Sequence, residues 1–550
     1  TSFNYILLCA QIQENVRYLR IPHNALLTTL YFYSALLLPP KESIISLTGF
    51  LAKTGNTHTI FPIGEEFMDR QNLTLMTDLY ELTMMQGYFK SKNDKTVVFD
   101  MFYRTNPSGG GYAIAAGLEQ VIQYIKELKF EKEDIEYLAS LNIFEEDFLE
   151  YLKAFRFTGD IYAVPEGTVV FPREPLLKVI APIMEAQLVE TAILNIINHQ
   201  SLIATKASRV AYAAQGDGIM EFGLRRAQGP DAGTYGARAA MIGGCIGTSN
   251  VLCGQLFDVP VKGTHAHSWI MSFEDEYTAF KTYANLYPNA CILLVDTYDT
   301  LKSGVPNAIR VFTEMREAGI NLGYYGIRLD SGDLAYMSKK ARKMLDAAGF
   351  PDAVISASSD LDEYLIESLK LQGAKITSWG VGTNLITSAD NPAFGGVYKL
   401  AAIRDEDGTF IPKIKLSENS AKVTNPGNKT VYRIYEKETG KIKADLICLA
   451  DEKYTEDDFI LLFDPNEPWK KTKMKPGTFT IKELLIPIFL KGECVYTSPS
   501  VMEIRDYCLK DQNTMWDETR RFANPHEVYV DLSSKLYDIK ISLLDEMSKD

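Results

Sequence analysis

Residues 322–349, LGYYGIRLDSGDLAYMSKKARKMLDAAG, contain one complete strand-loop-helix unit. The run 322–327 is rich in the aromatic and β-branched residues that favour strands. Residues 333–348 then carry apolar side chains at helical spacing, at positions 334, 337, 341, 344 and 345, and Gly349 follows where helices often end. The stretch therefore predicts a βα unit, with a charged loop, 328–333, between its two elements.

The same alternation continues on both sides of this unit, from about residue 218 to residue 400. Short apolar runs recur mostly about 30 residues apart, roughly the length of one βα unit, and helical patterns at 306–318, 333–348 and 360–371 separate the later ones. The predicted strands are 219–222, 259–263, 291–295, 322–327, 353–356 and 376–381. Their doubly apolar character is typical of a parallel sheet covered on both faces, which predicts a parallel barrel or near-barrel.

The flanking segments differ from this pattern. Before it lie a predicted strand at 97–103, a glycine-rich turn at 108–111 and an amphipathic helix at 118–128. After it come two predicted hairpins, 430–449 and 488–496, and a helix at 501–522 that we expect to close the chain. The expected domains are an N-terminal extension (1–67), an N-terminal α/β domain (68–200), a (β/α) barrel (201–400) and a C-terminal domain that packs on the N-terminal one (401–550).

Composition excludes several classes of protein. The chain has 550 residues, 46% of them hydrophobic, and a net charge of −14, so a large core is expected and a broad nucleic-acid surface is not. Its seven cysteines are scattered without a CxxC pair, as in reduced cytosolic proteins, and we expect a cytoplasmic location. The apolar run 25–38 is too short to span a membrane. Residues 1–67 are interpreted as a non-homologous or poorly ordered extension, with Met68 as the natural start of the folded part.

Polar, charged or glycine-rich residues follow each predicted strand, at the end of the sheet where parallel barrels place their reactive groups. The stretch GTHAHS, 263–268, puts two of only six histidines two residues apart. A zinc site would need further histidines at later strand ends, and the chain offers only His526, far beyond the barrel. Two alternatives remain open: a hydrogen-bonded structural histidine, and an acid-base or nucleophilic histidine oriented by Asp296 on the next strand.

The loop Arg328-x-Asp330-Ser331-Gly332-Asp333 combines an arginine fork with two carboxylates at the start of a helix. Such a loop suits an anion, and its aspartates suit hydrated Mg²⁺, although Asp333 can equally be a helix cap worth about 1 kcal/mol. The segment Gly380-Val381-Gly382-Thr383 resembles a phosphate-cradling backbone, but no GxxxxGK[ST] loop is present.

Together these motifs resemble the nicotinate phosphoribosyltransferases, which are type II phosphoribosyltransferases. The resemblance is collinear from residue 76 to about 430 and is carried by several motifs. They are TDLYELTMM (77–85), EFGLRRAQ (221–228), GTHAHS (263–268), LVDTYDT (294–300), GIRLDSGD (326–333), WGVGTNLIT (379–387), KLS (415–417) and TNPGNK (424–429). The family fold is an irregular (β/α) barrel packed on an α/β domain, here with a C-terminal, mostly antiparallel and helical extension.

The resemblance implies an ATP-dependent enzyme of NAD salvage. It joins nicotinate to 5-phosphoribosyl 1-diphosphate (PRPP), forms nicotinate mononucleotide and diphosphate, and works as a homodimer with shared active sites and Mg²⁺. Family members use ATP to phosphorylate one histidine, which matches His267 here, with Asp296 to orient it. A phosphate there adds about −1.5 to −2 charges beside the PRPP site.

Site roles follow from the same resemblance. Asp330 is catalytic and, with Asp333, a candidate Mg²⁺ ligand. Nicotinate contacts are assigned to Tyr80 (from the other subunit), Phe222, Thr264, Arg328 and Ser249. Contacts to PRPP and its phosphates are assigned to Arg225, Ser331, Gly332, Asp333, Gly380, Gly382 and Thr383. In the absence of the resemblance, Tyr80 and Phe222 would be interpreted as ordinary core residues.

Three competing functions stay open at this point. The nearest is a nicotinamide phosphoribosyltransferase on the same fold. In that relative an aspartate receives the carboxamide, where Ser249 stands in this chain, and the absence of that negative charge favours a carboxylate substrate. A metal-dependent barrel hydrolase and a non-catalytic binder of phosphosugars are the other two.

Overall fold

The computed structural model of the chain describes residues 72–416, 423–464, 467 and 469–547. The extension predicted at 1–67 lies outside these residues. Within the described ranges, no helix is both long and apolar enough to cross a membrane.

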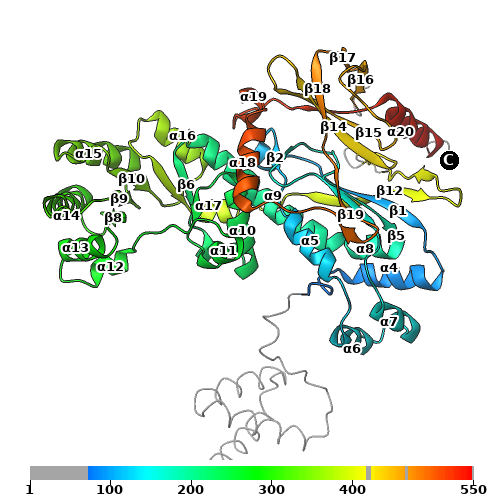
Figure 1. Ribbon diagram of the computed structural model, residues 1–550, viewed down its shortest axis with the longest axis horizontal. Helices are drawn as coiled ribbons and strands as arrows, with labels where there is room; N and C mark the ends of the chain where they lie inside the picture. The colour runs from blue at the N-terminus through cyan, green and yellow to red at the C-terminus, as the bar shows by residue number, and fades with distance from the viewer. Residues whose placement is uncertain (1–71, 417–422, 465–466, 468, 548–550) are drawn as a thin grey trace, which may run out of the picture. The chain divides into compact units, whose positions relative to one another are not determined.

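A seven-stranded antiparallel sheet is the basis of the first half of the fold (Figure 1). Its central strand β1 reads TVVFDMFY and is almost entirely buried; its one charged residue, Asp100, pairs with Lys429 at 2.6 Å. Strands far apart in sequence build this sheet, since β12 and β19 pair with β1 and β3 respectively. In spatial order the strands are β13 (Phe410–Pro412), β12 (Gly396–Arg404), β1 (Thr96–Tyr103), β5 (Leu177–Pro182), β3 (Asp160–Ala163), β19 (Ile486–Leu490) and β20 (Glu493–Cys494).

Helix α9 (Glu190–Ala213) is the longest described helix and connects the two halves. Ile193, Ile196 and Ile197 belong to the core under the antiparallel sheet, whereas Ala207 and Val210 belong to the core of the parallel sheet. The domain boundaries expected at 200/201 and 400/401 fall inside α9 and β12. The other helices before the parallel sheet are α4 (Leu79–Lys90), α5 (Leu118–Glu127), α6 (Lys132–Ser140), α7 (Glu146–Lys153) and α8 (Ile183–Leu188); a small sheet pairs β2 (Ala113–Ile114) with β4 (Val169–Val170).

The second half is built on a six-stranded parallel sheet, as the βα alternation predicted. In spatial order its strands are β7 (Gly247–Thr248), β6 (Gly218–Glu221), β11 (Ser378–Val381), β10 (Val354–Ala357), β9 (Tyr324–Leu329) and β8 (Ala290–Leu294). Its described helices are α10 (Pro230–Gly243), α11 (Val251–Phe257), α12 (His267–Met271), α13 (Glu276–Leu286), α14 (Val305–Glu317), α15 (Leu334–Ala347), α16 (Glu363–Leu371) and α17 (Thr383–Ile386).

The strand predicted at 259–263 is wrong as a full strand. Only an isolated parallel bridge between Thr248 and Val261 forms there. Pro260 has no N–H to extend a ladder, and on the other side of the segment the N–H of Leu294 in β8 meets the side chain of His265 instead of a backbone carbonyl. The hydrogen-bonded sheet is therefore open between this segment and β8, and the barrel is irregular.

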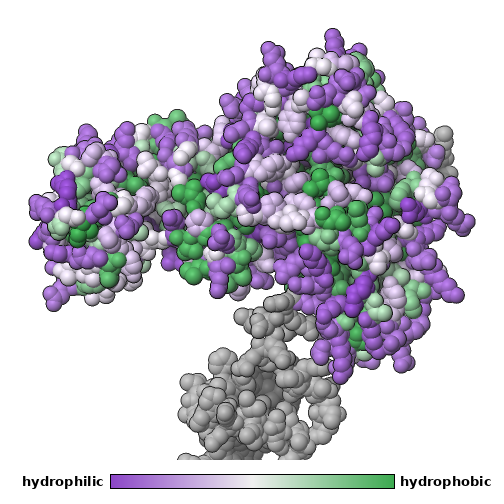
Figure 2. Space-filling model, in the orientation of Figure 1, coloured by the Kyte–Doolittle hydropathy of each residue, from purple (hydrophilic) through white to green (hydrophobic). Residues whose placement is uncertain are grey.

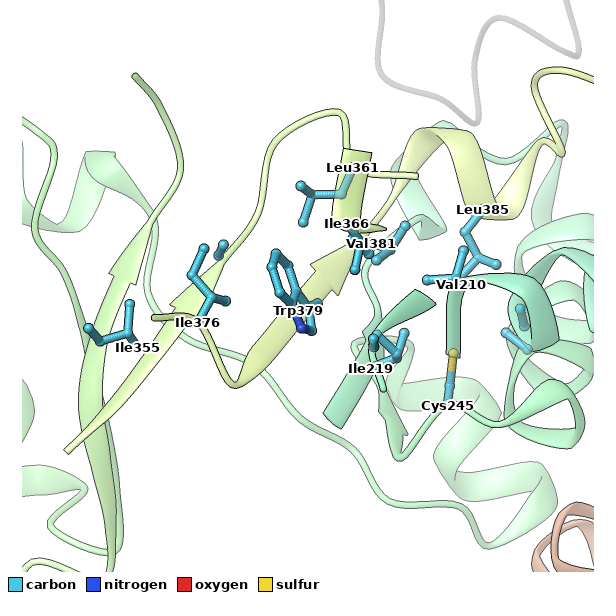
Figure 3. Close-up of a cluster of buried hydrophobic side chains, with 14 of the residues drawn as sticks. Val210, Ile219, Cys245, Ile355, Leu361, Ile366, Ile376, Trp379, Val381 and Leu385 are labelled. Atoms are coloured by element: carbon cyan, nitrogen blue, oxygen red, sulfur yellow. The ribbon is translucent and has the colours of Figure 1, made fainter. Parts of the chain in front are cut away.

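Apolar side chains from strands and helices meet at Trp379 on β11 (Figure 3). Ile219 of β6 and Ile366 of α16 lie in the same fully buried cluster. The indole Nε1–H of Trp379 donates to Asp217 at 3.0 Å, so the polar atom of this large side chain is satisfied. The doubly apolar strands and the helical patterns of the sequence thus contribute to one core.

The C-terminal segment adds a six-stranded sheet that carries the predicted hairpin. Its order is β17 (Lys471–Met474), β16 (Ile460–Phe463), β21 (Tyr529–Leu532), β15 (Ile442–Leu449), β14 (Lys429–Glu436) and β18 (Phe479–Glu483). The helix expected to close the chain ends early: α18 (Val501–Gln512) and α19 (Asp517–Arg520) are followed by β21 and α20 (Ser534–Met547). Leu532 and Leu536 are fully buried, which explains why these late elements fold back onto the sheet.

Buried ion pairs tie α9 and α10 to their neighbours. Arg209 and Lys206 of α9 both pair with Glu363 of α16, at 2.8 and 2.7 Å, and Arg238 of α10 pairs with Glu166 at 2.7 Å. The side chains of these five residues are at most 4% exposed. Removal of one partner would leave the others charged in a low-dielectric core.

Glu363→Ala is expected to lower the free energy of unfolding by about 3–5 kcal/mol, because Arg209 and Lys206 lose their shared carboxylate. Denaturant unfolding followed by circular dichroism measures this effect. Glu367→Ala on the exposed side of the same helix is the matched control and should change stability by less than about 0.5 kcal/mol. Equal effects of the two substitutions would contradict the assigned role of the buried pair.

Candidate active site

His267 and Asp296 lie together, as the sequence proposed. Nε2 of His267 is 3.2 Å from Oδ1 of Asp296, and the histidine side chain is 39% exposed whereas the aspartate is 2% exposed. His267 is the first residue of α12, and Asp296 follows β8. A buried carboxylate thus holds one ring nitrogen of a histidine whose other side faces solvent.

The second oxygen of Asp296 holds the neighbouring loop. Its Oδ2 accepts hydrogen bonds from the backbone N–H of Asp330 and from Oγ of Ser331, both at 2.7 Å. The carboxylate therefore joins the end of β8 to the end of β9. Any shift of the 330–331 loop would be transmitted to His267 through a single side chain.

Arg328 is the hub of the adjacent strand ends. Its Nε–H donates to Oγ of Ser358 at 2.8 Å, one Nη1–H to Oγ1 of Thr264 at 2.9 Å, and one Nη2–H to Oδ1 of Asp330 at 3.1 Å. Ser358 Oγ also donates to the same oxygen of Asp330. The guanidinium is mostly buried, with its side chain 18% exposed, so its remaining N–H groups have little access to water.

The ring of Phe222 lies beside this arginine, with Cζ of Arg328 5.8 Å from the ring centroid. Two glycines of β11 and its following turn make room for it. A Cβ on Gly380 would stand 2.6 Å from the ring, and one on Gly382 would stand 3.1 Å from the Phe222 carbonyl oxygen. The close approach of Phe222 accounts for glycine at both positions, where the sequence suggested a phosphate cradle.

A buried carboxylate that the sequence analysis gave no role supports Phe222. Glu221 accepts hydrogen bonds from the Gly223 N–H and, at 2.6 Å, from Oγ1 of Thr248. Burial raises the pKa of Glu221, which these two donors partly offset. The backbone N–H of Ser249 donates to the carbonyl of Glu221 at 2.9 Å. Glu221 thus fixes the ends of β6 and β7 together. A lone acid inside the otherwise apolar run 219–222 was the signal for it.

The other histidine of the pair is structural. Nε2 of His265 accepts the Leu294 N–H at 3.3 Å, and its ring packs edge-on against Tyr283 with centroids 4.7 Å apart. Burial lowers the pKa of His265 to about 4, so its ring is neutral near pH 7. Among the described residues, no group of three or more His, Cys, Asp or Glu side chains could hold a metal ion.

Comparisons with known proteins identify the family of the chain. A sequence model of the nicotinate phosphoribosyltransferase family matches residues 218–433, and models of the family's N-terminal and C-terminal domains match residues 75–198 and 428–540. The chain is 47% identical over 477 residues to the nicotinate phosphoribosyltransferase of Bacillus subtilis (strain 168), an alignment that spans 86% of this chain and 96% of that protein. The chain belongs to the nicotinate phosphoribosyltransferase family.

Human relatives extend the comparison to three dimensions. The nicotinate phosphoribosyltransferase of Homo sapiens is 31% identical over 527 residues, which covers 85% of this chain and 96% of that protein. The crystal structure of human nicotinic acid phosphoribosyltransferase matches with a TM-score of 0.73 at 30% identity, over 85% of this chain and 99% of that one. The predicted type II phosphoribosyltransferase fold is confirmed.

The remaining residues assigned from the family pattern lie around the same strand ends. Arg225 is exposed in a 3-10 turn (Leu224–Arg226) directly after Phe222. Thr383 begins α17 immediately after Gly382, and Gly332 has a positive φ of 77° in the 330–333 turn. Asp333 caps α15, since its Oδ1 accepts the Tyr336 N–H at 2.9 Å. Asp333 is therefore a helix cap, as the second interpretation of the sequence proposed, and its other carboxylate oxygen takes no part in the cap.

Tyr80 stands apart from these residues. It lies on α4, which packs on α8, and 46% of its surface is exposed. Within the described ranges, no hydrogen bond, ion pair or ring contact joins it to the strand ends. Its neighbour Glu81 is buried and accepts hydrogen bonds from Oγ1 of Thr77 and, at 2.8 Å, of Thr191 on α9; burial raises the pKa of Glu81 to about 7. The motif around Tyr80 is therefore anchored to the long helix.

His265→Gln is expected to remove one component of the pH dependence of stability. The folded state resists protonation of His265, so the contribution of this residue to the free energy of unfolding falls as pH drops from about 6.5 towards 4, by about 2 kcal/mol between pH 7 and pH 5, and the variant lacks this loss. Denaturant unfolding at the two pH values measures the difference. The exposed His526 provides the control, because His526→Gln should leave the wild-type slope in place; a His265→Gln slope equal to that of wild type would refute the assignment.

Proposed function

We propose that this protein is a nicotinate phosphoribosyltransferase, which joins nicotinate to PRPP and forms nicotinate mononucleotide and diphosphate. Family membership supports the activity, and the Arg328-Phe222 pair carries the choice of substrate. An aromatic face beside a mostly buried guanidinium suits a flat ring that bears a carboxylate.

The hydrogen bonds of Arg328 show what is left for a ligand. A guanidinium has five N–H donors, and three of them have acceptors among the described residues: Ser358, Thr264 and Asp330. Two donors remain, the number that a carboxylate accepts in a bidentate pair. A carboxamide would present its own NH₂ donors to one of them, so the arrangement favours nicotinate over nicotinamide.

Ser249 supports the same preference. It lies at the end of β7 beside Glu221, at the position where the nicotinamide-using relative is expected to carry an aspartate. A serine there adds no negative charge against the nicotinate carboxylate, and an unpaired like charge in such a pocket would cost several kcal/mol.

In the transfer step, the pyridine nitrogen forms a bond to C1 of the ribose while the bond from C1 to the diphosphate oxygen breaks. The state between them is oxocarbenium-like, so the protein must hold the base and the phosphates in line. Arg225, exposed in the turn that follows Phe222, is the proposed contact of the leaving diphosphate. Thr383, Gly382 and Gly380 are the proposed contacts of the 5-phosphate.

The carboxylates of the 330–333 loop fit Mg²⁺ in part. Oδ1 of Asp330 is already bonded to Arg328 and Ser358, and Oδ1 of Asp333 caps α15, so each side chain keeps one oxygen outside these bonds. Mg²⁺ usually takes one or two carboxylates and fills its octahedron with phosphate oxygens and water. Bound there, the ion would neutralise the charge that develops on the diphosphate.

His267 is the proposed site of phosphorylation by ATP. When Nε2–H donates to Asp296, the lone pair of the outward ring nitrogen, Nδ1, is free to attack the γ-phosphorus of ATP, and the bond from that phosphorus to the β,γ-bridging oxygen breaks. Asp296 is a positioning residue in this step, because it holds the tautomer. The phosphorylated ring would then be joined to the 330–331 loop by two hydrogen bonds in series, both made by Asp296.

A homodimer with shared sites is part of the proposal. Figure 2 shows an apolar area over the region of α10 and α11, where Val251, Leu252 and Leu256 are at least half exposed. A contiguous apolar surface of this kind is typical of protein contacts. Tyr80 is exposed, and within the described ranges no contact joins it to the strand ends around Phe222. In such a dimer it would reach the nicotinate ring of the other subunit.

Product formation tests the function directly. Purified protein with PRPP and Mg²⁺, offered nicotinate or nicotinamide in parallel and each with and without ATP, is expected to form nicotinate mononucleotide preferentially and faster with ATP. Chromatography of the products measures both. A preference for nicotinamide would move the protein to the sister activity, and no product from either base would overturn the proposal.

His267→Asn is expected to abolish the ATP-dependent acceleration, because the nucleophilic ring nitrogen is gone, while Asp296 keeps its hydrogen bonds to the 330–331 loop and so preserves the local fold. ATP hydrolysis and product formation measured together report the change. His526→Asn, on an exposed histidine outside the site, should keep wild-type stimulation. Stimulation that survives in His267→Asn would remove the phosphohistidine from the mechanism.

A further inference from the structure

Ser358 occupies a central place among the strand ends although its sequence context gave it no role. It follows β10 directly, and only 4% of its surface is exposed. Its hydroxyl accepts the Nε–H of Arg328 at 2.8 Å and donates to Oδ1 of Asp330. One oxygen atom therefore satisfies both members of the Arg328-Asp330 ion pair.

This double contact determines the rotation of the guanidinium. Asp330 alone, through a single oxygen at 3.1 Å from Nη2, lets the planar group swing about that contact. Ser358 at Nε and Thr264 at Nη1 fix two further points, and three points define a plane. The two unused donors of Arg328 are then aimed in fixed directions before any ligand arrives, which lowers the ordering cost of binding.

The backbone around Ser358 is held as well. Its N–H donates to the carbonyl of Leu329 on β9 at 2.9 Å, so it is locked to the strand that carries Arg328. The next two residues, Ser359 and Asp360, have positive φ angles of 89° and 33°. Non-glycine residues in this region are strained, and the chain turns away sharply just after the serine hydroxyl has been placed.

We propose that Ser358 is a positioning residue that presets Arg328 for a carboxylate and so determines the affinity for the acidic base. This inference rests on the proposed nicotinate activity. Without the hydroxyl, Arg328 keeps its charge and its pairing with Asp330 but loses the fixed plane. Attraction to an anion survives, whereas the bidentate geometry with the base does not.

The test is steady-state kinetics of Ser358→Ala with nicotinate and PRPP varied in turn. The nicotinate KM is expected to rise about tenfold more than the PRPP KM. A KM is insensitive to the fraction of folded protein, so partial unfolding alone would not produce this split. Ser356→Ala is the matched control: Ser356 is 3% exposed, lies two residues earlier on the same strand, and its hydroxyl meets Ser378 instead of Arg328.

Ser358→Thr tests whether the hydroxyl group, and not the volume of the side chain, determines the effect. It retains the donor and acceptor, so its nicotinate KM should stay within about threefold of wild type. The inference is overturned if Ser358→Ala leaves the nicotinate KM unchanged, if both KM values rise equally, or if Ser358→Thr behaves like alanine. If Ser358→Ala does not fold, the nicotinate KM of the threonine variant is the deciding measurement. A wild-type enzyme that makes no product from nicotinate would instead refute the proposed function.

Discussion

Helix α9 is the element on which the rest of the structure depends, because it supplies apolar side chains to two separate cores. A helix with apolar residues all round must be covered on every side. Several of its polar positions are also buried. Arg209 and Lys206 both pair with Glu363 of α16 in the parallel half, and Lys206 pairs with Asp390 as well, at 2.6 Å. The antiparallel sheet and the parallel sheet therefore share one rigid support, and neither can be formed fully without it.

From that support the site is built by side chains that bridge strand ends. Asp296 joins β8 to the 330–331 loop, Arg328 reaches both Thr264 and Ser358, and Glu221 joins β6 to β7. Most of these bridges join strands that are already paired in the sheet, whereas the bond between Arg328 and Thr264 links β9 to the segment beside the open side. The consequence is a preorganised site, in which the functional groups are oriented by one another and by the sheet before any substrate binds.

Sequence reasoning predicted the elements with strong local signals and missed those defined by distant partners. The parallel strands, helix α15 and the β14-β15 hairpin followed from periodicity and turns. The long α9 was hidden because its all-round apolar pattern shows no amphipathic stripe, and β12 joins β1 across nearly 300 residues of sequence. In the site, the family pattern named His267, Asp296 and Arg328. The role of Ser358 could be recognised only from its bonds, and that of Glu221 had only a weak signal, a lone acid in an apolar run. The TNPGNK motif likewise has a structural use, since Lys429 neutralises the buried Asp100.

The imidazole of His265 caps the edge of β8 that has no backbone partner strand at Leu294. Without it, the Leu294 N–H at the free side of β8 would be an open template on which another chain could add a strand. Many proteins protect such an edge with a lysine or a proline. Here one nitrogen atom of a neutral imidazole accepts the hydrogen bond of the strand. Protonation turns that acceptor into a donor and uncovers the edge. The capping of this edge therefore depends on the charge state of one buried histidine, two residues from the one proposed to carry the phosphate.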